Sequence, residues 1–393
     1  MRTLPLLAVA VGLGALAVAG AAACGEDTAL VRPRLDAGGL DAETPDAPGG
    51  DSGALACGAV VPTTYESAAF AQNAAVEIAL AQRFAELGEK MRSAEGASGV
   101  TDVTANDLKA IYSAGAPSLR AVSTTEAQAL VDAYFADFEA AMGNAWEPPL
   151  ADQDGGAPSG GKYGDAIFDA TGIHLRAATE RTLLGGAFYN HVLGLVASPI
   201  TDATIDKLVA AFGASPTFAN RTGPDAGADA DRLIAERASR LEAAMSPAPG
   251  PYSTMKGALL RMKAAVKGGE SCKADLDEAV TTFLAEWERT TYASAISSLS
   301  AAVSSAANPT AGATTLHAFG DAVGFVQSFR GVGRRKITDV QIDAVLTKVG
   351  ADTAFKLVTS PGDRSLKLNE AINDIQLYEG FSPAEVEAFK KSL

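Results

Sequence analysis

Aromatic residues, charged residues and cysteines are all scarce in this chain of 393 residues. Aromatic side chains make up 6% and charged side chains 20% of the sequence, whereas 47% of the residues are hydrophobic. So apolar a composition excludes a chain that is disordered throughout, because disorder accompanies low hydrophobicity and high net charge. With three cysteines, the chain also differs from the small secreted domains that are held together mainly by disulfides.

Positive charge is the scarcer kind of charge. Lysine and arginine total 32 against 47 aspartates and glutamates, which leaves a formal net charge of -15 at pH 7. Binding to nucleic acid depends on a positive field that neutralises phosphates. The acidic balance therefore excludes a protein whose main partner is a nucleic acid.

The motifs of common enzymes are absent as well. The sequence has no His-Glu-x-x-His, no Gly-x-Ser-x-Gly, no phosphate-binding P-loop, no Cys-x-x-Cys and no dinucleotide-binding glycine fingerprint. Its histidines are limited to His174, His191 and His317, so acid–base catalysis by histidine has few candidates. We therefore expect a protein that is not an enzyme.

What the sequence has in abundance is helix-forming residues. Alanine accounts for about a fifth of the chain, and apolar residues recur at steps of three or four from residue 66 onward. These patterns predict an all-α, multi-helix body of about ten helices. The expected helices cover 66–93, 104–112, 123–142, 165–195, 201–212, 232–245, 253–267, 273–307, 314–329, 338–349, 366–378 and 382–391. A loop rich in proline and glycine at 146–161 could divide the body into two packed bundles.

The N-terminus has the features of an export signal. Arg2 precedes an uncharged apolar run, and the small residues Ala21-Ala22-Ala23 lead directly to Cys24. This arrangement resembles a bacterial lipobox, which implies that residues 1–23 are removed and that Cys24 carries lipid. Simple secretion and an uncleaved membrane anchor are the alternatives.

A segment of different composition separates this signal from the helical body. Residues 24–58 are rich in Asp, Gly, Ala and Pro, which predicts a flexible acidic tether ahead of a body at 59–393. Gly25 is not the aspartate that typically retains lipoproteins in the inner membrane. The lipobox resemblance thus implies an outer-membrane lipoprotein of the cell envelope, held by its lipid, with a periplasmic or surface-exposed body.

Two cysteines remain if Cys24 carries lipid. In an oxidising compartment, Cys57 and Cys272 are expected to form a disulfide that joins the end of the tether to the middle of the body. The competing interpretation is a pair of independent buried thiols.

A metal site is the one chemical centre that the side chains suggest. His317 and Asp321 are four residues apart, so they share a helix face and could supply two ligands to iron or another divalent metal. His174 is a third candidate, although Arg181 shares its face and disfavours a cation there. Protein metal sites usually need three or four ligands. The alternative for the His317 and Asp321 pair is an ordinary hydrogen bond at a helix surface.

The surroundings of His174 carry a first resemblance. Gly172-Ile173-His174 is similar to the first half of the Gly-x-His-x-x-Glu motif of imelysin-like proteins, which are all-helical envelope proteins linked with iron acquisition. Ala177 stands at the place of the glutamate, so the metal role of that motif is not carried over. The resemblance implies an alternative function, a metal-binding or peptidase-type protein that uses His174 or the His317 and Asp321 pair.

Three sequence blocks carry a second and longer resemblance, over about residues 65–350. They are Ala170-Thr171-Gly172-Ile173 with Leu183-Leu184-Gly185-Gly186-Ala187, then Tyr252-Ser253-Thr254-Met255, and the stretch from His317-Ala318-Phe319 to Gln327-Ser328-Phe329. They resemble a family of uncharacterised all-helical bacterial lipoproteins, a domain of unknown function found near iron-uptake loci. Lys256-Gly257-Ala258 departs from the pattern of that family. The resemblance implies a non-enzymatic envelope lipoprotein whose body binds a small ligand or another envelope protein and assists metal or iron uptake.

Overall fold

The chain divides into two units, Met1–Pro45 and Asp46–Leu393. The computed structural model describes residues 53–96, 98–149, 159–220, 230–245, 249–308 and 310–392, all of which belong to the second unit. The predicted signal at 1–23, the lipid site at Cys24 and most of the predicted tether lie outside the described residues.

The described part of the chain is all-α, as the sequence predicts, apart from one two-stranded hairpin. Its first half comprises α1 (Phe70–Asn73), α2 (Ala75–Arg92), α3 (Ala105–Tyr112), α4 (Leu119–Val122), α5 (Thr125–Ala141), β1 (Gly161–Tyr163), β2 (Ala166–Phe168), α6 (Leu175–Leu183), the π-helix η1 (Leu184–Tyr189), α7 (Asn190–Val196) and α8 (Asp202–Phe212). Its second half comprises α9 (Leu233–Ala244), α10 (Pro251–Gly268), the 3-10 helix η3 (Gly269–Cys272), α11 (Lys273–Ala306), α12 (Gly312–Gln327), α13 (Asp339–Val349), the 3-10 helix η4 (Ala351–Thr353), α14 (Lys356–Thr359), α15 (Pro361–Glu379) and α16 (Pro383–Phe389). None of these helices combines the length and the apolar composition needed to cross a membrane.

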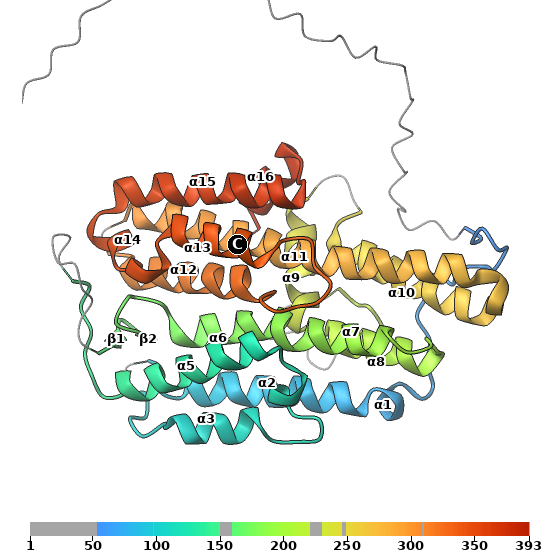
Figure 1. Ribbon diagram of the computed structural model, residues 1–393, viewed down its shortest axis with the longest axis horizontal. Coiled ribbons are helices and arrows are strands. Elements are labelled where there is room, and N and C mark those ends of the chain that lie inside the picture. Colours follow the sequence, from blue (N-terminus) through green and yellow to red (C-terminus); the bar gives the residue numbers. More distant parts are fainter. Residues whose placement is uncertain are drawn as a thin grey trace, which may run out of the picture. The chain divides into compact units, whose positions relative to one another are not determined.

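The helices stack in layers with α11 and α12 at the centre. In Figure 1, α15 and α16 lie on one side of α11, α12 and α13, while α6 and α7 lie on the other side and α2, α3 and α5 lie beyond them. Helix α12 packs against both α11 and α6, so it links the C-terminal layers to the N-terminal ones. Helices α5 and α6, which flank the predicted loop at 146–161, also pack directly on each other.

The 34-residue helix α11 can be buried along much of its length because its polar side chains are satisfied internally. Thr290, Thr291 and Ser294 are buried, and each hydroxyl donates a hydrogen bond to a carbonyl one turn earlier in the helix. The small side chains of Ala293 and Ala295 let neighbouring helices approach. Small polar residues of α11 therefore form part of the buried core.

The helix ends follow the capping chemistry of the sequence. The side chains of Thr104, Thr201, Thr338 and Ser382 each accept a hydrogen bond from the third helical residue in a capping box. Such caps are worth about 1 kcal/mol each relative to alanine. They explain why the start positions of α3, α8, α13 and α16 could be predicted closely.

The prediction of one helix over 165–195 is wrong for its first ten residues or so. Gly161–Tyr163 pairs with Ala166–Phe168 in an antiparallel hairpin whose turn contains Gly164 at a φ of +60°. The carboxylate of Asp169 then accepts hydrogen bonds from the backbone N–H groups of Thr171 and Ile173. These hydrogen bonds stabilise a loop that extends to the start of α6. Side-chain competition for backbone hydrogen bonds thus prevents helix there.

Gly185 and Gly186 lie in the π-helix η1, which separates α6 from α7. A Cβ on Gly186 would lie 2.4 Å from the Cβ of Ala127 in α5, so glycine is required for this close packing. The carbonyl of Gly186 accepts a hydrogen bond from the N–H of Thr124, the N-cap of α5, at 2.8 Å. The π-helix therefore provides a carbonyl for a neighbouring helix, as such bulges can.

Candidate functional site

His174 occupies the start of α6, directly after the loop that Asp169 organises. Its side chain is fully buried, and its ring lies 5.4 Å from that of Phe168 at the end of the hairpin. Gly172, at a φ of +97°, allows the chain to turn into this position. The hairpin and the Asp169 loop therefore place the imidazole inside the protein, facing α12.

The second predicted histidine meets the first across the interface between α6 and α12. The Nδ1 atoms of His174 and His317 lie 2.6 Å apart, a hydrogen bond in which one nitrogen donates and the other accepts. The other ring nitrogen of His174, Nε2, lies 2.7 Å from Oε1 of Glu95 and donates to this carboxylate. Burial and the neighbouring His174 lower the pKa of His317 to about 4, so its imidazole is neutral at pH 7.

Two arginines extend this contact into a closed ring of side chains. The guanidinium of Arg176 contacts Glu95 at 2.8 Å and Glu180 at 3.2 Å. That of Arg181 contacts Asp321 at 2.7 Å and Glu180 at 3.6 Å. Nε2 of His317 lies 3.8 Å from Oδ2 of Asp321. The ring runs through Glu95, Arg176, Glu180, Arg181, Asp321, His317 and His174.

Charge pairing keeps two carboxylates of this ring, those of Asp321 and Glu95, ionised. Burial alone would raise the pKa of Asp321, but Arg181 and Arg237 outweigh it and lower that pKa to about 2. Burial opposes ionisation of Glu95 in the same way, and hydrogen bonding and charge from His174 and Arg176 lower its pKa. Both side chains are therefore anionic over the whole physiological range of pH.

A cavity of about 540 Å³ opens beside the ring, between α2, α6, α9 and α12. Asp321, Glu180, Arg176, Arg181 and His317 contribute to its wall. The segment Arg232–Arg240, which includes most of α9, and the face of α2 from Ala81 to Arg92 complete it. The ring is thus one wall of a hollow that has the volume of a small-molecule site.

Two glycines of α12 make this wall possible, because each stands where a side chain would separate α12 from α6, and Gly88 in α2 leaves room for the carboxylate of Glu180. A Cβ on Gly320 in α12 would lie 2.9 Å from the Cβ of His174, and one on Gly324 would lie 2.7 Å from the Cβ of Arg181. A Cβ on Gly88 in α2 would lie 2.5 Å from Oε1 of Glu180. Gly320 and Gly324 therefore let α12 approach α6 closely enough for His317 and Asp321 to reach their partners.

The structure brings all three predicted ligands together but gives them other partners. His174, His317 and Asp321 lie side by side, although both nitrogens of His174 take part in hydrogen bonds and Asp321 pairs with Arg181. Within the described ranges, the only three His, Cys, Asp or Glu residues with donor atoms within 4.8 Å of one another are Cys57, Cys272 and Asp275. The residues around His174 thus do not fit a three-ligand metal centre, and their metal role stays a prediction.

Most of the ring has no signal in the sequence. Glu95 lies in the turn after α2, 79 residues from His174, so no local spacing connects the two. The sequence places Arg181 on the same helix face as His174, but the partner of Arg181, Asp321, comes from another helix. The remaining histidine, His191, lies elsewhere and pairs with buried Glu77 at 2.8 Å.

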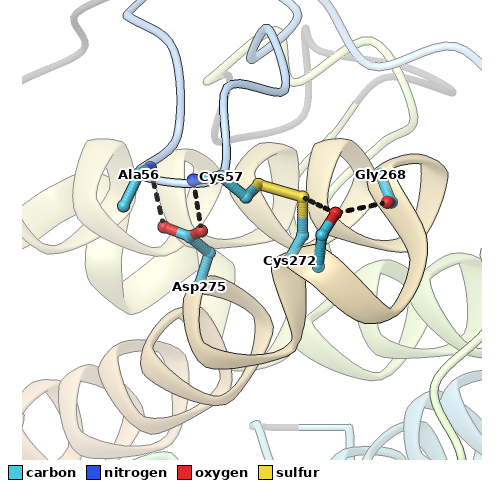
Figure 2. The surroundings of a disulfide bond; sticks show 6 residues. Ala56, Cys57, Gly268, Cys272 and Asp275 are labelled. Atoms are coloured by element: carbon cyan, nitrogen blue, oxygen red, sulfur yellow. Dashed lines mark hydrogen bonds between the residues drawn. A yellow bond between two sulfur atoms is a disulfide. The ribbon is translucent and has the colours of Figure 1, made fainter.

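The two cysteines expected to pair are joined by a disulfide whose Cα atoms are 5.1 Å apart (Figure 2). The carboxylate of Asp275 accepts hydrogen bonds from the N–H groups of Ala56 and Cys57, both at 3.1 Å (Figure 2). A Cβ on Gly268 would lie 2.2 Å from the sulfur of Cys272, so glycine makes room for the bridge. The disulfide and the two hydrogen bonds to Asp275 together fix the start of the body to the beginning of α11.

The residues that the sequence predicts to be functional lie in two places, at the charged cavity and at the disulfide. The disulfide region has a structural role, because its sulfurs are bonded and Asp275 caps the backbone at residues 56 and 57. The cavity is the feature whose charged and polar side chains face open space. Comparisons of the chain with protein-family models, with curated proteins and with solved structures gave no match.

Proposed function

We propose that this protein is a lipid-anchored, non-enzymatic component of the cell envelope whose helical body binds a small ligand in the charged cavity. The observation that supports the ligand site is the cavity of about 540 Å³, lined by side chains from four helices. The membrane anchor and the envelope location rest on the sequence of residues 1–58.

The wall of the cavity is preorganised. Arg176 and Arg181 are each held by two carboxylates, and their side chains are 13% and 16% exposed. Groups fixed in this way lose little conformational entropy when a ligand arrives, which favours binding. A role of the bound ligand in metal or iron uptake is the further part of this proposal, and it rests on the family resemblance alone.

The alternative, an imelysin-like metal-binding or peptidase-type protein, has one observation in its favour. Nε2 of His317 and Oδ2 of Asp321 lie 3.8 Å apart at the cavity wall, so two potential ligand atoms face the same space. Arg176 and Arg181 lie beside them and oppose a cation electrostatically. We therefore favour ligand binding without catalysis.

A variant that fills the cavity tests the proposal. Ala81 in α2 lines the cavity, and Ala81→Trp should occlude it, whereas Gln82→Trp places the same side chain on the exposed face of the helix. The melting temperature of the full chain in detergent is measured with a panel of organic acids, sugar phosphates, amines and neutral sugars. At least one compound should stabilise the wild type and Gln82→Trp but not Ala81→Trp. A panel in which no compound distinguishes the two variants would count against a ligand site here.

A further inference from the structure

The arginines that line the cavity outnumber its carboxylates. They are Arg92, Arg176, Arg181, Arg232, Arg237 and Arg240, against Glu89, Glu180, Glu236 and Asp321. Glu95 lies behind the wall and pairs with Arg176, and counting it still leaves one net positive charge. This local excess stands out in a chain whose net charge is -15.

Pairing within the cavity shows which arginines carry the excess. Arg92 pairs with Glu89, and Arg240 contacts Glu236 at 2.6 Å, while Arg176 and Arg181 belong to the ring. Among the described residues, no carboxylate oxygen lies within 4.0 Å of the side-chain nitrogens of Arg232 or Arg237. Within the described ranges, two guanidinium groups that face the cavity therefore lack a carboxylate in contact.

Arg237 is the more informative of the two because it is half-buried, whereas Arg232 is exposed. Its guanidinium carbon lies 5.5 Å from the ring centroid of buried Phe325, and that of Arg181 lies 5.6 Å from the same centroid. Burial, and then repulsion from Arg181, lower the pKa of Arg237 to about 10, although Asp321 and Glu236 attract it from beyond contact distance. Two guanidinium groups that are partly withdrawn from water and lie near the same ring repel each other, and an anion bound between them would relieve this repulsion.

We propose that the cavity binds a small organic oxyanion, a carboxylate or a phosphate, with Arg237 as its main anchor and Arg232 as a second contact at the rim. This inference deepens the proposed function and rests on it. A guanidinium presents parallel N–H donors that match the oxygens of a carboxylate or phosphate, so the unpaired groups favour this chemistry over a neutral ligand. The cavity is larger than a single phosphate ion needs, which leaves room for the organic part of the ligand beside Phe84 and His317.

The test is a calorimetric titration of the full chain in detergent with inorganic phosphate and, separately, with succinate, with sodium chloride at matched ionic strength as reference. We expect saturable binding of at least one oxyanion and none of chloride. Arg237→Gln should weaken that binding about tenfold or more, the usual effect of removing a charge-assisted hydrogen bond. Arg261→Gln is the matched control, because Arg261 is a half-buried arginine outside the cavity whose nearest acidic oxygen, on Glu278, lies 3.7 Å away.

The outcomes separate this inference from the proposed function. Binding of phosphate alone identifies a phosphate ester as the ligand class, and binding of succinate alone identifies a carboxylate. Equal affinity of Arg237→Gln and wild type would overturn the inference, as would the absence of binding by both oxyanions. If a neutral or cationic compound binds and Ala81→Trp abolishes that binding, the anion site is wrong while the ligand cavity stands. Should Arg237→Gln fail to fold, Arg232→Gln at the exposed rim gives the same comparison, because its side chain has no place in the core.

Discussion

The imidazole Nδ1 atoms of His174 and His317 lie 2.6 Å apart although 143 positions separate the two residues in the sequence. This contact exists because the backbones of α6 and α12 approach each other closely. The spacing is set by Gly320, whose missing side chain leaves room for the backbone and Cβ of His174.

We predict that Gly320→Ala destabilises the protein. The added Cβ would lie 2.9 Å from the Cβ of His174 and 3.0 Å from its backbone nitrogen, so α12 must move away from α6. Overpacking of this kind costs about 1–3 kcal/mol, which outweighs a gain in helix propensity of up to about 1 kcal/mol. Gly257→Ala in α10 is the matched control, because among the described residues no atom outside the adjoining backbone of its own helix lies within 4 Å of the added Cβ. Urea unfolding should show a loss of stability for the first variant and a small gain for the second, and equal stabilities would refute the close-packing argument.

Glu379 at the end of α15 should make the stability of the protein depend on pH. It is 1% exposed, and burial together with the charge of Glu288 raises its pKa to about 7. A carboxyl group whose pKa is raised on folding contributes stability that is fully present below its unfolded pKa and is lost as the pH rises through its folded pKa. Glu379→Gln removes this loss, so the variant should be more stable than the wild type near pH 8, by up to about 3 kcal/mol, and the difference should shrink near pH 5.

The pH series for Glu379→Gln needs an exposed glutamate for comparison. Glu278 in α11 has a side chain that is 67% exposed, so Glu278→Gln should change the unfolding free energy little at either pH. A difference between Glu379→Gln and wild type that stays constant from pH 5 to 8 would show that titration of Glu379 is not its cause.

Loss of the bridge between Cys57 and Cys272 should weaken the attachment of the first described residues. The bridge closes a span of 215 residues, and native disulfides usually contribute about 2–4 kcal/mol. Cys57→Ser should lower the unfolding free energy by that order and expose the chain near residue 57 to limited proteolysis. On a non-reducing gel the wild type, but not the variant, should change its mobility on reduction. A wild type whose mobility is insensitive to reductant would contradict the bridge.

Metal content tests the alternative function directly. We expect the purified full chain to hold no stoichiometric iron or zinc, because His174 is engaged by Glu95 and His317, and Arg181 and Asp321 neutralise each other. Elemental analysis should therefore give the same low content for wild type, His174→Ala and His317→Ala. About one metal ion per chain in the wild type, lost in either variant, would overturn this expectation and favour the imelysin-like alternative.

Lipid attachment is testable at Cys24. Cys24→Ser removes the thiol that the lipobox resemblance marks, so the protein should move from the membrane fraction to the soluble fraction and lose incorporation of labelled palmitate. Thr28→Ser serves as the control, because it is an equally small change four residues away that keeps the thiol of Cys24, so fractionation should be unchanged. Palmitate labelling that persists in Cys24→Ser would show that Cys24 is not the lipid-bearing residue.

Local sequence determined much of the secondary structure. The capping boxes at Thr104, Thr201, Thr338 and Ser382 set helix starts through hydrogen bonds that span three residues. The helical periodicity and the abundance of alanine determined the all-α class for the same reason, since both act within a few turns. Where a side chain competed for the backbone, as Asp169 does ahead of α6, the periodicity gave the wrong answer.

The site depended on the tertiary structure. The sequence by itself marked His174, His317 and Asp321 by residue type, and it also suggested the Cys57 and Cys272 pair. It contained no signal for Glu95 as a partner of His174 or for Arg237 as an unpaired cation, because both properties depend on helices that meet only after folding. Electrostatic character is set by distances through space, so the arginine excess of the cavity appears only when α2, α6, α9 and α12 enclose it. An acidic chain with few positive charges thus gathers six of its arginines around one cavity.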